Sequence, residues 1–142
     1  MKFILIITVF FSIALNMRAQ HTTKIFINDK KAAEVTVRSD QPEAVLLIKK
    51  TAHKNYNSFI IQVSGEYVGG EIYKRTLELS GESSEIINET ENKPGFFVFS
   101  KTDSIDQLLS GKTIALYLLL NPSNPLMAVP SRRVFLGNLV MK

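Results

Sequence analysis

The hydrophobic pattern of the chain is dominated by one run, KTIALYLLLN at 112–121, which is the longest apolar stretch outside the N-terminus. It is much shorter than the ~20 apolar residues that cross a membrane as a helix. Periodicity alone does not separate a strand from a buried helix in so short a run, but Gly111 before it and Asn121-Pro122 after it favour a strand. We predict that it is the central strand of a small all-β domain.

Side chains on a strand alternate between its two faces, and in this run both faces are apolar. One face carries Ile114, Leu116, Leu118 and Leu120, and the other carries Ala115, Tyr117 and Leu119. An antiparallel sheet with one wet face would show polar residues on that face instead. We therefore expect a helix, a long loop or another chain to cover the second face.

Eight further segments have the short alternating or apolar patterns of strands, at intervals near ten residues. They lie at 24–27, 34–38, 44–50, 58–64, 71–79, 86–87, 96–100 and 132–141. Turn residues separate them, as at 28–31 and 92–95. About nine short strands at this spacing predict an all-β fold, an antiparallel β-sandwich that is immunoglobulin-like or related.

The pattern changes to helical spacing at 103–110, just before the penultimate strand. Thr102 or Asp103 can cap the first turn, and Gly111 supplies a left-handed stop. The apolar stripe consists of Ile105, Leu108 and Leu109. A helix of about two turns is not stable alone, so we expect it to lie on the sheet and to cover one end of the 112–121 strand.

The first nineteen residues have the organisation of a secretory signal peptide. Lys2 gives a positive start, 3–15 form the apolar core, and Ala19 offers a small residue for cleavage, although Met17 stands where a small residue is preferred. The alternative is an uncleaved anchor, for which this core is short. We expect a signal peptide at 1–19, cleavage near Ala19, and a single β-sandwich domain over 20–142. The mature domain would be periplasmic or secreted and would have no transmembrane span.

Charge and cysteine content narrow the class of function. Removal of Lys2 and Arg18 leaves 15 basic and 13 acidic residues, so the mature chain carries 15 − 13 = +2. A net charge of +2 is too small to indicate a basic surface that binds nucleic acid. The chain has no cysteine, which excludes disulfides and thiolate metal sites. An exported domain without disulfides must depend on its apolar core, which fits a bacterial protein.

The residue types that catalysis or metal binding needs are sparse. The two histidines are His21 and His53, and because zinc needs three or four ligands we expect both to be exposed surface residues. Ser104 stands between Asp103 and Asp106, but helix capping explains all three, and no histidine is placed to orient them. We predict no catalytic, cofactor-binding or metal-ligating residues, and therefore no enzyme.

The remaining charged segments are interpreted as solvated. The glutamates at 82, 85, 89 and 91 lack the spacing of a calcium loop, so we expect most of 81–95 to be a solvated, mobile loop.

On the 71–79 strand, Lys74, Thr76 and Glu78 share one face, which should be wet. The pair Arg132-Arg133 could contact an acidic partner or a sugar acid, or simply solubilise a strand end.

The chain has more apolar side chains than a two-sheet core needs. The surplus consists of Ile60, Ala115, Tyr117, Leu119, Leu126, Met127 and Val129. The short helix and the proline-rich loop at 121–130 could fold over them; otherwise an exposed apolar patch marks an interaction site. We therefore expect an exported, non-catalytic binding module that docks on an envelope protein or forms a homo-oligomer.

A small-ligand carrier is the alternative, with an apolar pocket for a lipid or glycan between the sheets or under the proline-rich loop. The tyrosines that could line it are Tyr56, Tyr67, Tyr73 and Tyr117. An enzyme is the third class of function, but the sequence lacks the paired general acid–base and nucleophilic residues that an enzyme needs.

Overall fold

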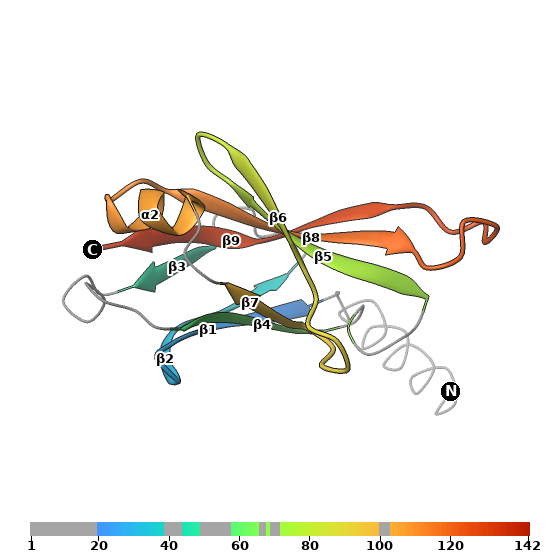
Figure 1. Ribbon diagram of the computed structural model, residues 1–142, viewed down its shortest axis with the longest axis horizontal. Coiled ribbons are helices and arrows are strands. Elements are labelled where there is room, and N and C mark those ends of the chain that lie inside the picture. Colours follow the sequence, from blue (N-terminus) through green and yellow to red (C-terminus); the bar gives the residue numbers. More distant parts are fainter. Residues whose placement is uncertain (1–19, 39–43, 49–57, 66–67, 69–71, 100–102) are drawn as a thin grey trace, which may run out of the picture.

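The computed structural model of the chain describes residues 20–38, 44–48, 58–65, 68, 72–99 and 103–142. In these ranges the chain forms nine strands and one short helix, and the strands form two sheets that pack face to face (Figure 1). The predicted all-β sandwich, with a helix before the penultimate strand, is confirmed. The expected signal peptide at 1–19 lies outside the described residues.

The first sheet has four antiparallel strands in the order β2-β1-β4-β7. They are β1 (Gln20–Ile27), β2 (Lys30–Arg38), β4 (Phe59–Gly65) and β7 (Phe96–Phe99). Asn28 and Asp29 close the β1–β2 hairpin with positive φ angles of 50° and 64°. Asn and Asp tolerate this left-handed region, and two such residues in succession give a turn whose twist suits a hairpin. The turn predicted at 28–31 is confirmed at Asn28 and Asp29, whereas Lys30 and Lys31 already belong to β2.

The second sheet has five strands in the order β3-β9-β8-β5-β6. They are β3 (Val45–Ile48), β5 (Tyr73–Ser80), β6 (Ser84–Asn88), β8 (Ile114–Pro122) and β9 (Arg132–Met141). β8 is central, as the 112–121 run predicts. The β3–β9 pair is parallel, so the prediction of a purely antiparallel sandwich is wrong at this edge. Only strands far apart in the sequence can pair in this way, because a tight turn always reverses the chain.

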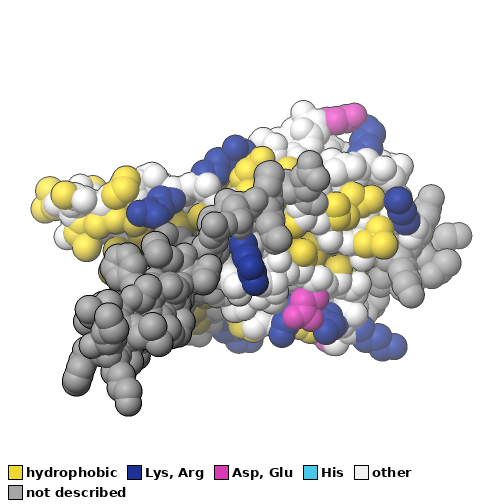
Figure 2. Space-filling view, turned by 180° about the vertical axis from the view of Figure 1, so that it is seen from behind, with side chains coloured by type: hydrophobic (Ala, Val, Ile, Leu, Met, Phe, Trp, Pro, Cys, Tyr) yellow, Lys and Arg dark blue, Asp and Glu magenta, His cyan; other side chains and the backbone are white. Residues whose placement is uncertain are grey.

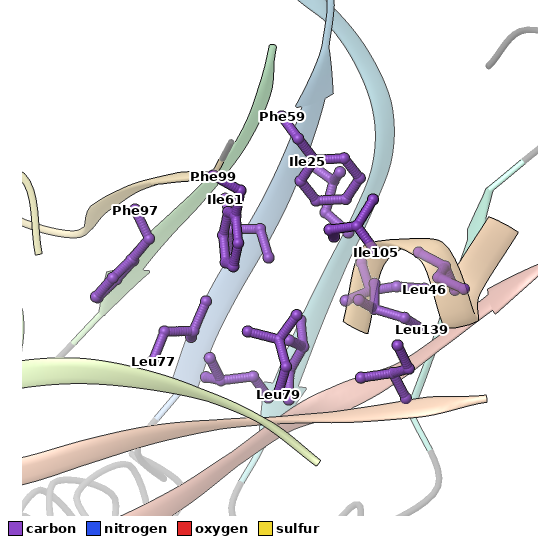
Figure 3. Packing of buried hydrophobic residues seen from close by; sticks show 14 of the residues in the cluster. Ile25, Leu46, Phe59, Ile61, Leu77, Leu79, Phe97, Phe99, Ile105 and Leu139 are labelled. Atoms are coloured by element: carbon purple, nitrogen blue, oxygen red, sulfur yellow. The ribbon is translucent and has the colours of Figure 1, made fainter. Parts of the chain in front are cut away.

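The inward sides of both sheets form one continuous hydrophobic core (Figure 3). The side chains on the inner face of β8 are all 0% exposed, and they are Ile114, Leu116, Leu118 and Leu120. Phe59 and Phe99, from the opposite sheet, pack edge to face with their ring centroids 5.7 Å apart. Each such buried side chain contributes about 1.5–3 kcal/mol. Since the chain has no disulfide, this core is the main source of its stability.

The helix α2 (Asp103–Leu109) packs near the start of β8, and its buried side chains Ile105 and Leu108 belong to the same core. It ends as predicted, at a glycine with positive φ: Gly111 has φ of 90° and its backbone N–H donates to the carbonyl of Leu108. A helix this short is held by such tertiary contacts rather than by its own hydrogen bonds.

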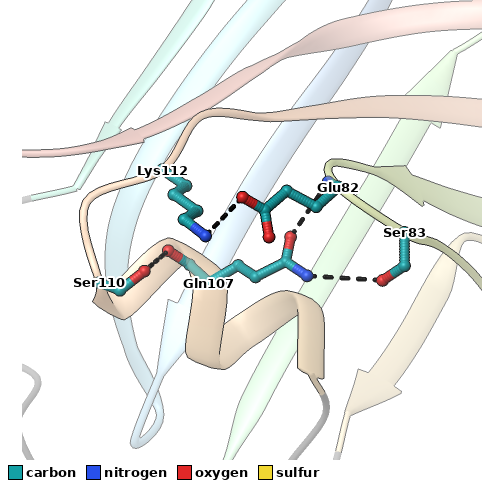
Figure 4. Close-up of polar contacts among 5 residues, drawn as sticks. All are labelled: Glu82, Ser83, Gln107, Ser110 and Lys112. Atoms are coloured by element: carbon teal, nitrogen blue, oxygen red, sulfur yellow. Dashed lines mark hydrogen bonds and ion pairs between the residues drawn. The ribbon is translucent and has the colours of Figure 1, made fainter.

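The side chain of Gln107 joins this helix to the turn between β5 and β6 (Figure 4). Its Oε1 accepts a hydrogen bond from the backbone N–H of Glu82 at 3.3 Å, and its Nε2 donates to Ser83 Oγ at 3.4 Å. Lys112 Nζ pairs with the Glu82 carboxylate at 2.5 Å. These contacts lie at the surface, where each contributes about 1 kcal/mol or less. Their combined effect is to fix the helix against the hairpin.

A partly buried ion pair fastens the segment after β6 to the sheet. Arg75, on the inner side of β5, is 7% exposed, and the Glu89 side chain is 19% exposed. Arg75 donates from Nε to Oε2 at 2.5 Å and from Nη2 to Oε1 at 3.0 Å, and Gly95 N–H donates to Oε2 at 2.8 Å. The expectation that Glu89 lies in a solvated, mobile loop is therefore wrong, because its carboxylate accepts three hydrogen bonds.

Candidate interaction surface

The outer side of the five-stranded sheet carries the second apolar face of β8. Residues that pair across antiparallel strands point to the same side, so the register places Tyr117 beside Phe135 and Glu78, and Leu119 beside Arg133. We define the outer apolar face by seven residues on this side, which are Val45, Leu47, Ile86, Tyr117, Leu119, Phe135 and Val140.

The outer apolar face is half-buried at its centre and exposed toward both edges. Val45 and Leu47, on the edge strand β3, are 49% and 50% exposed, and Ile86, on the opposite edge strand β6, is 60% exposed. The aromatic and leucine side chains of β8 and β9 between them are partly buried. Single exposed apolar residues are common, but apolar side chains on three adjacent strands, β3, β9 and β8, together with Ile86 at the far edge, are the composition of an interface.

At the centre of this face a guanidinium group stacks on an aromatic ring. The Arg133 Cζ atom lies 3.6 Å from the centroid of the Tyr117 ring. Arg133 Nε and Nη2 donate to the two carboxylate oxygens of Glu78 at 3.0 and 3.1 Å, and Tyr117 packs against Phe135 with ring centroids 5.5 Å apart. The hydrogen bonds to Glu78 raise the pKa of Arg133 above its ordinary value, so the group stays charged. The surface is thus apolar with one internally paired charge on it.

The predicted wet face of β5 is wrong at two of its three residues. Lys74 is exposed, but Thr76 is 8% exposed and the Glu78 side chain 14%. Their cross-strand partners on β8 are large, Leu119 and Tyr117, and these side chains cover them. Alternation in the sequence assigns the side of the sheet correctly, but it does not show how bulky the neighbouring strand is on that side.

In the described structure neither predicted cover lies over the outer apolar face. The helix directs Ile105 and Leu108 into the inner core. The proline-rich loop between β8 and β9 extends past the sheet, with Leu126 91% and Met127 40% exposed. The expectation that these two elements bury the surplus apolar residues is therefore wrong.

The surplus residues instead separate into three places. Tyr117 and Leu119 belong to the outer apolar face. Ile60 lies on the outer side of the other sheet, where the register sets it between Phe26 and Val98. The residues of the proline-rich loop form a third group at the end of the β8–β9 hairpin.

Among the residues weighed for chemistry, His21 is described by the structure and is buried. His21 is 4% exposed on the inward side of β1, with its ring against Gly65. The expectation of an exposed histidine is wrong because His21 shares the inner face with Thr23, Ile25 and Ile27. No group of three or more histidine and carboxylate side chains that could hold a metal ion exists within the described ranges.

Several candidates lie outside what the structure describes. They are His53, Tyr56, Tyr67 and the side chains of Asp103 and Ser104. Asp106 is exposed on the helix, and Tyr73 is partly buried against the core.

Sequence reasoning missed most of the outer apolar face. Leu47 and Val140 stand side by side in the parallel β3–β9 pair, and no local pattern predicts that pairing. A usable signal was present, because 45–48 and 132–141 contain apolar residues at both odd and even positions, as 112–121 does. Three adjacent strands with two apolar faces define an apolar surface on each side of the sheet.

Comparison of the chain with protein-family models, curated proteins and solved structures gave no match. Within the described part of the chain, no helix has the length and hydropathy of a membrane span.

Proposed function

We propose that the chain is an exported, non-catalytic binding module, and that the outer apolar face is its docking surface. The occupant to which we commit is a second copy of the same chain. The observation that carries the proposal is the set of apolar side chains on β3, β9, β8 and β6, four of the five strands, which is half-exposed at both edges of the sheet.

Self-association is supported by the character of this face. A two-fold dimer buries the same patch on both subunits, so the patch must complement itself in shape and charge. The face carries both a cation, Arg133, and an anion, Glu78, already joined at 3.0 Å, so this central pair can meet a second copy without uncompensated charge.

The size of the face fits a moderate interface. Five strands spaced about 4.8 Å apart and nearly 30 Å long along β8 span a face of about 600–700 Å² in projection. A standard interface buries about 800 Å² on each partner. A weak dimer that forms at micromolar concentrations is therefore expected rather than an obligate one.

Sedimentation velocity over a concentration series tests this proposal. We expect the wild type to shift from monomer to dimer as concentration rises, and Leu47→Glu to stay monomeric because it places a charge at the exposed edge of the face. Val98→Glu is the matched control, since Val98 is 52% exposed on the outer side of the other sheet while Leu47 is 50% exposed. The control should dimerise like the wild type.

A wild type that stays monomeric at every concentration and binds no apolar dye contradicts the proposal. A monomer that does bind the dye rejects the second copy and leaves a different envelope protein as the occupant.

Export is part of the same proposal. It is supported by the leader pattern at 1–19. N-terminal sequencing of the chain after expression in a bacterial host should give a start near Gln20. A retained Met1 in the purified protein contradicts cleavage.

The carrier hypothesis stays a prediction. The space between the sheets is filled by core side chains such as Phe59, Ile61 and Leu118, which are at most 1% exposed, so no specific observation favours a ligand there. Native mass spectrometry of the purified protein tests it directly, because a carrier should retain a co-purified lipid or glycan.

A further inference from the structure

The end of the β8–β9 hairpin presents exposed apolar side chains in a fixed conformation. We define the apolar tip as Ile72, Leu126 and Met127, which are 51%, 91% and 40% exposed. Ser123 N–H donates to the carbonyl of Ile72 at 2.8 Å, which holds the segment before β5 against the loop.

One residue, Asn124, organises the turn that displays these side chains. Its Oδ1 accepts from the backbone N–H of Leu126 at 3.0 Å, and its carbonyl accepts from Met127 N–H at 3.0 Å. Pro122, Pro125 and Pro130 restrict the loop further. The tip is thus built to project its apolar residues, whereas an unconstrained loop could fold them onto the sheet.

The hairpin extends beyond the neighbouring strands at one end of the sandwich (Figure 1). From behind, it is the narrow arm on the left, with hydrophobic surface along it and basic side chains at its base (Figure 2). A leucine exposed at 91% on such a projection has no concave neighbour to shield it. The end of the hairpin is therefore a convex projection and not a binding groove.

Two cations stand where the hairpin leaves the sheet: Lys74, which pairs in register with Asn121, and Arg132, which pairs with Leu120. Arg133 follows, but its guanidinium group is already paired with Glu78 at 3.0 Å. No carboxylate occurs among described residues 72–74 and 120–133; Glu71, the nearest acid in sequence, is outside the described ranges. Lys74 is two residues from Ile72, and Arg132 is five residues from Met127, which is at most about 18 Å of extended chain.

We propose that the apolar tip inserts into the surface of a lipid bilayer that carries anionic headgroups. Apolar side chains gain most from burial in the acyl boundary, and cations held just behind them are attracted to the negative surface above it. A convex tip suits a soft planar phase better than a rigid protein pocket. This surface is separate from the outer apolar face, so the proposal does not depend on self-association.

The absence of cysteine allows a single reporter to be placed at the tip. Ala128→Cys, labelled with an environment-sensitive fluorophore, keeps Leu126 and Met127 intact. The full-length chain is mixed with vesicles of phosphatidylcholine alone or with phosphatidylglycerol added. We expect a blue shift with the mixed vesicles, a much weaker one with phosphatidylcholine alone, and loss of the shift at high salt.

The matched variant adds Leu126→Glu and Met127→Glu to the labelled protein. Its apparent affinity for the mixed vesicles, measured by the blue shift, should be at least about tenfold lower. A second label at Thr36→Cys, on an exposed position of β2, should remain aqueous. Thermal melts check that each variant is folded. Because the readout is local, binding through the apolar residues at 3–15 does not mimic insertion of the tip.

Four outcomes overturn the proposal. The first two are that the chain binds mixed vesicles while the fluorophore at position 128 stays in water, and that the chain does not bind mixed vesicles at all. The third is an equal blue shift with both vesicle types. The fourth is a blue shift of the fluorophore without vesicles as protein concentration rises. The last result assigns the tip to a protein contact instead.

Discussion

Removal of the Glu89 carboxylate is the sharpest test of how the segment after β6 is held. The variant Glu89→Ala leaves the Arg75 guanidinium, which is 7% exposed, without the partner that accepts two of its N–H groups. It also leaves the Gly95 N–H without its acceptor. Breaking a buried pair by removing one partner costs about 3–5 kcal/mol, because the remaining charge is desolvated and uncompensated.

We expect a loss near the lower end of that range, about 3 kcal/mol, because Glu89 keeps 19% of its side-chain exposure and water can reach part of the site. A domain of this size has a total stability of about 5–15 kcal/mol, so the variant should remain folded at room temperature. Its melting temperature should fall by about 10 °C. Urea denaturation followed by circular dichroism measures the free energy of unfolding.

A double-mutant cycle separates this pair from its surroundings. The cycle compares Arg75→Met, Glu89→Gln and the double variant. The double variant removes both charges and keeps an acceptor for Gly95, so it should recover most of the loss seen in Glu89→Gln alone, with a coupling energy of about 2 kcal/mol or more. The exposed pair Lys31–Glu34, at 2.8 Å, is the control, and breaking it should change the free energy of unfolding far less, because exposed ion pairs contribute little. If Glu89→Ala costs no more than that control, the pair is not buried as described and the reasoning is refuted.

Two further predictions concern a glycine and a titrating group. Gly95 has φ of 81°, and an added Cβ would overlap the carbonyl oxygen of Val63, so Gly95→Ala should lower the free energy of unfolding by about 2 kcal/mol or more. Gly111→Ala, with φ of 90° and nothing within 4 Å of the added Cβ, should lower it by only about 1 kcal/mol. Equal losses in urea melts would reject the steric argument. The hydrogen bond from Lys31 lowers the pKa of Glu34 below its ordinary value of 4.5, so its stabilising contribution is present at neutral pH and is lost as pH falls through the lowered value. An NMR titration should therefore place the Glu34 midpoint below 4.5, and Lys31→Ala should return it toward that value; an unchanged midpoint in the variant would show that Lys31 is not the cause.

The sequence predicts the local elements of this fold well because their signals are local. The two-faced apolar run identifies β8 as central, the Asn28-Asp29 turn closes a hairpin, and Gly111 ends the helix. Each signal depends on a few adjacent residues whose backbone preferences act before any tertiary contact forms.

The contacts that the sequence did not predict depend on strand register. Arg75 and Glu89 resemble any other charged residues on a strand and in a loop until the β5–β6 pairing, in which Thr76 stands opposite Asn88, sets them side by side. The parallel β3–β9 pair joins two ends of the domain, and no local pattern predicts it. For this reason the centre of the outer apolar face was predicted from 112–121, while its β3 and β9 parts were not.

The most direct test of the docking surface is methyl NMR over a protein concentration series. If two copies meet through the outer apolar face, the methyl signals of Leu47, Ile86 and Val140 should shift together as concentration rises, while those of Ile60 and Val98 on the other sheet stay fixed. Signals that move on the other sheet, or on neither sheet, would contradict the central claim that this face binds a second copy.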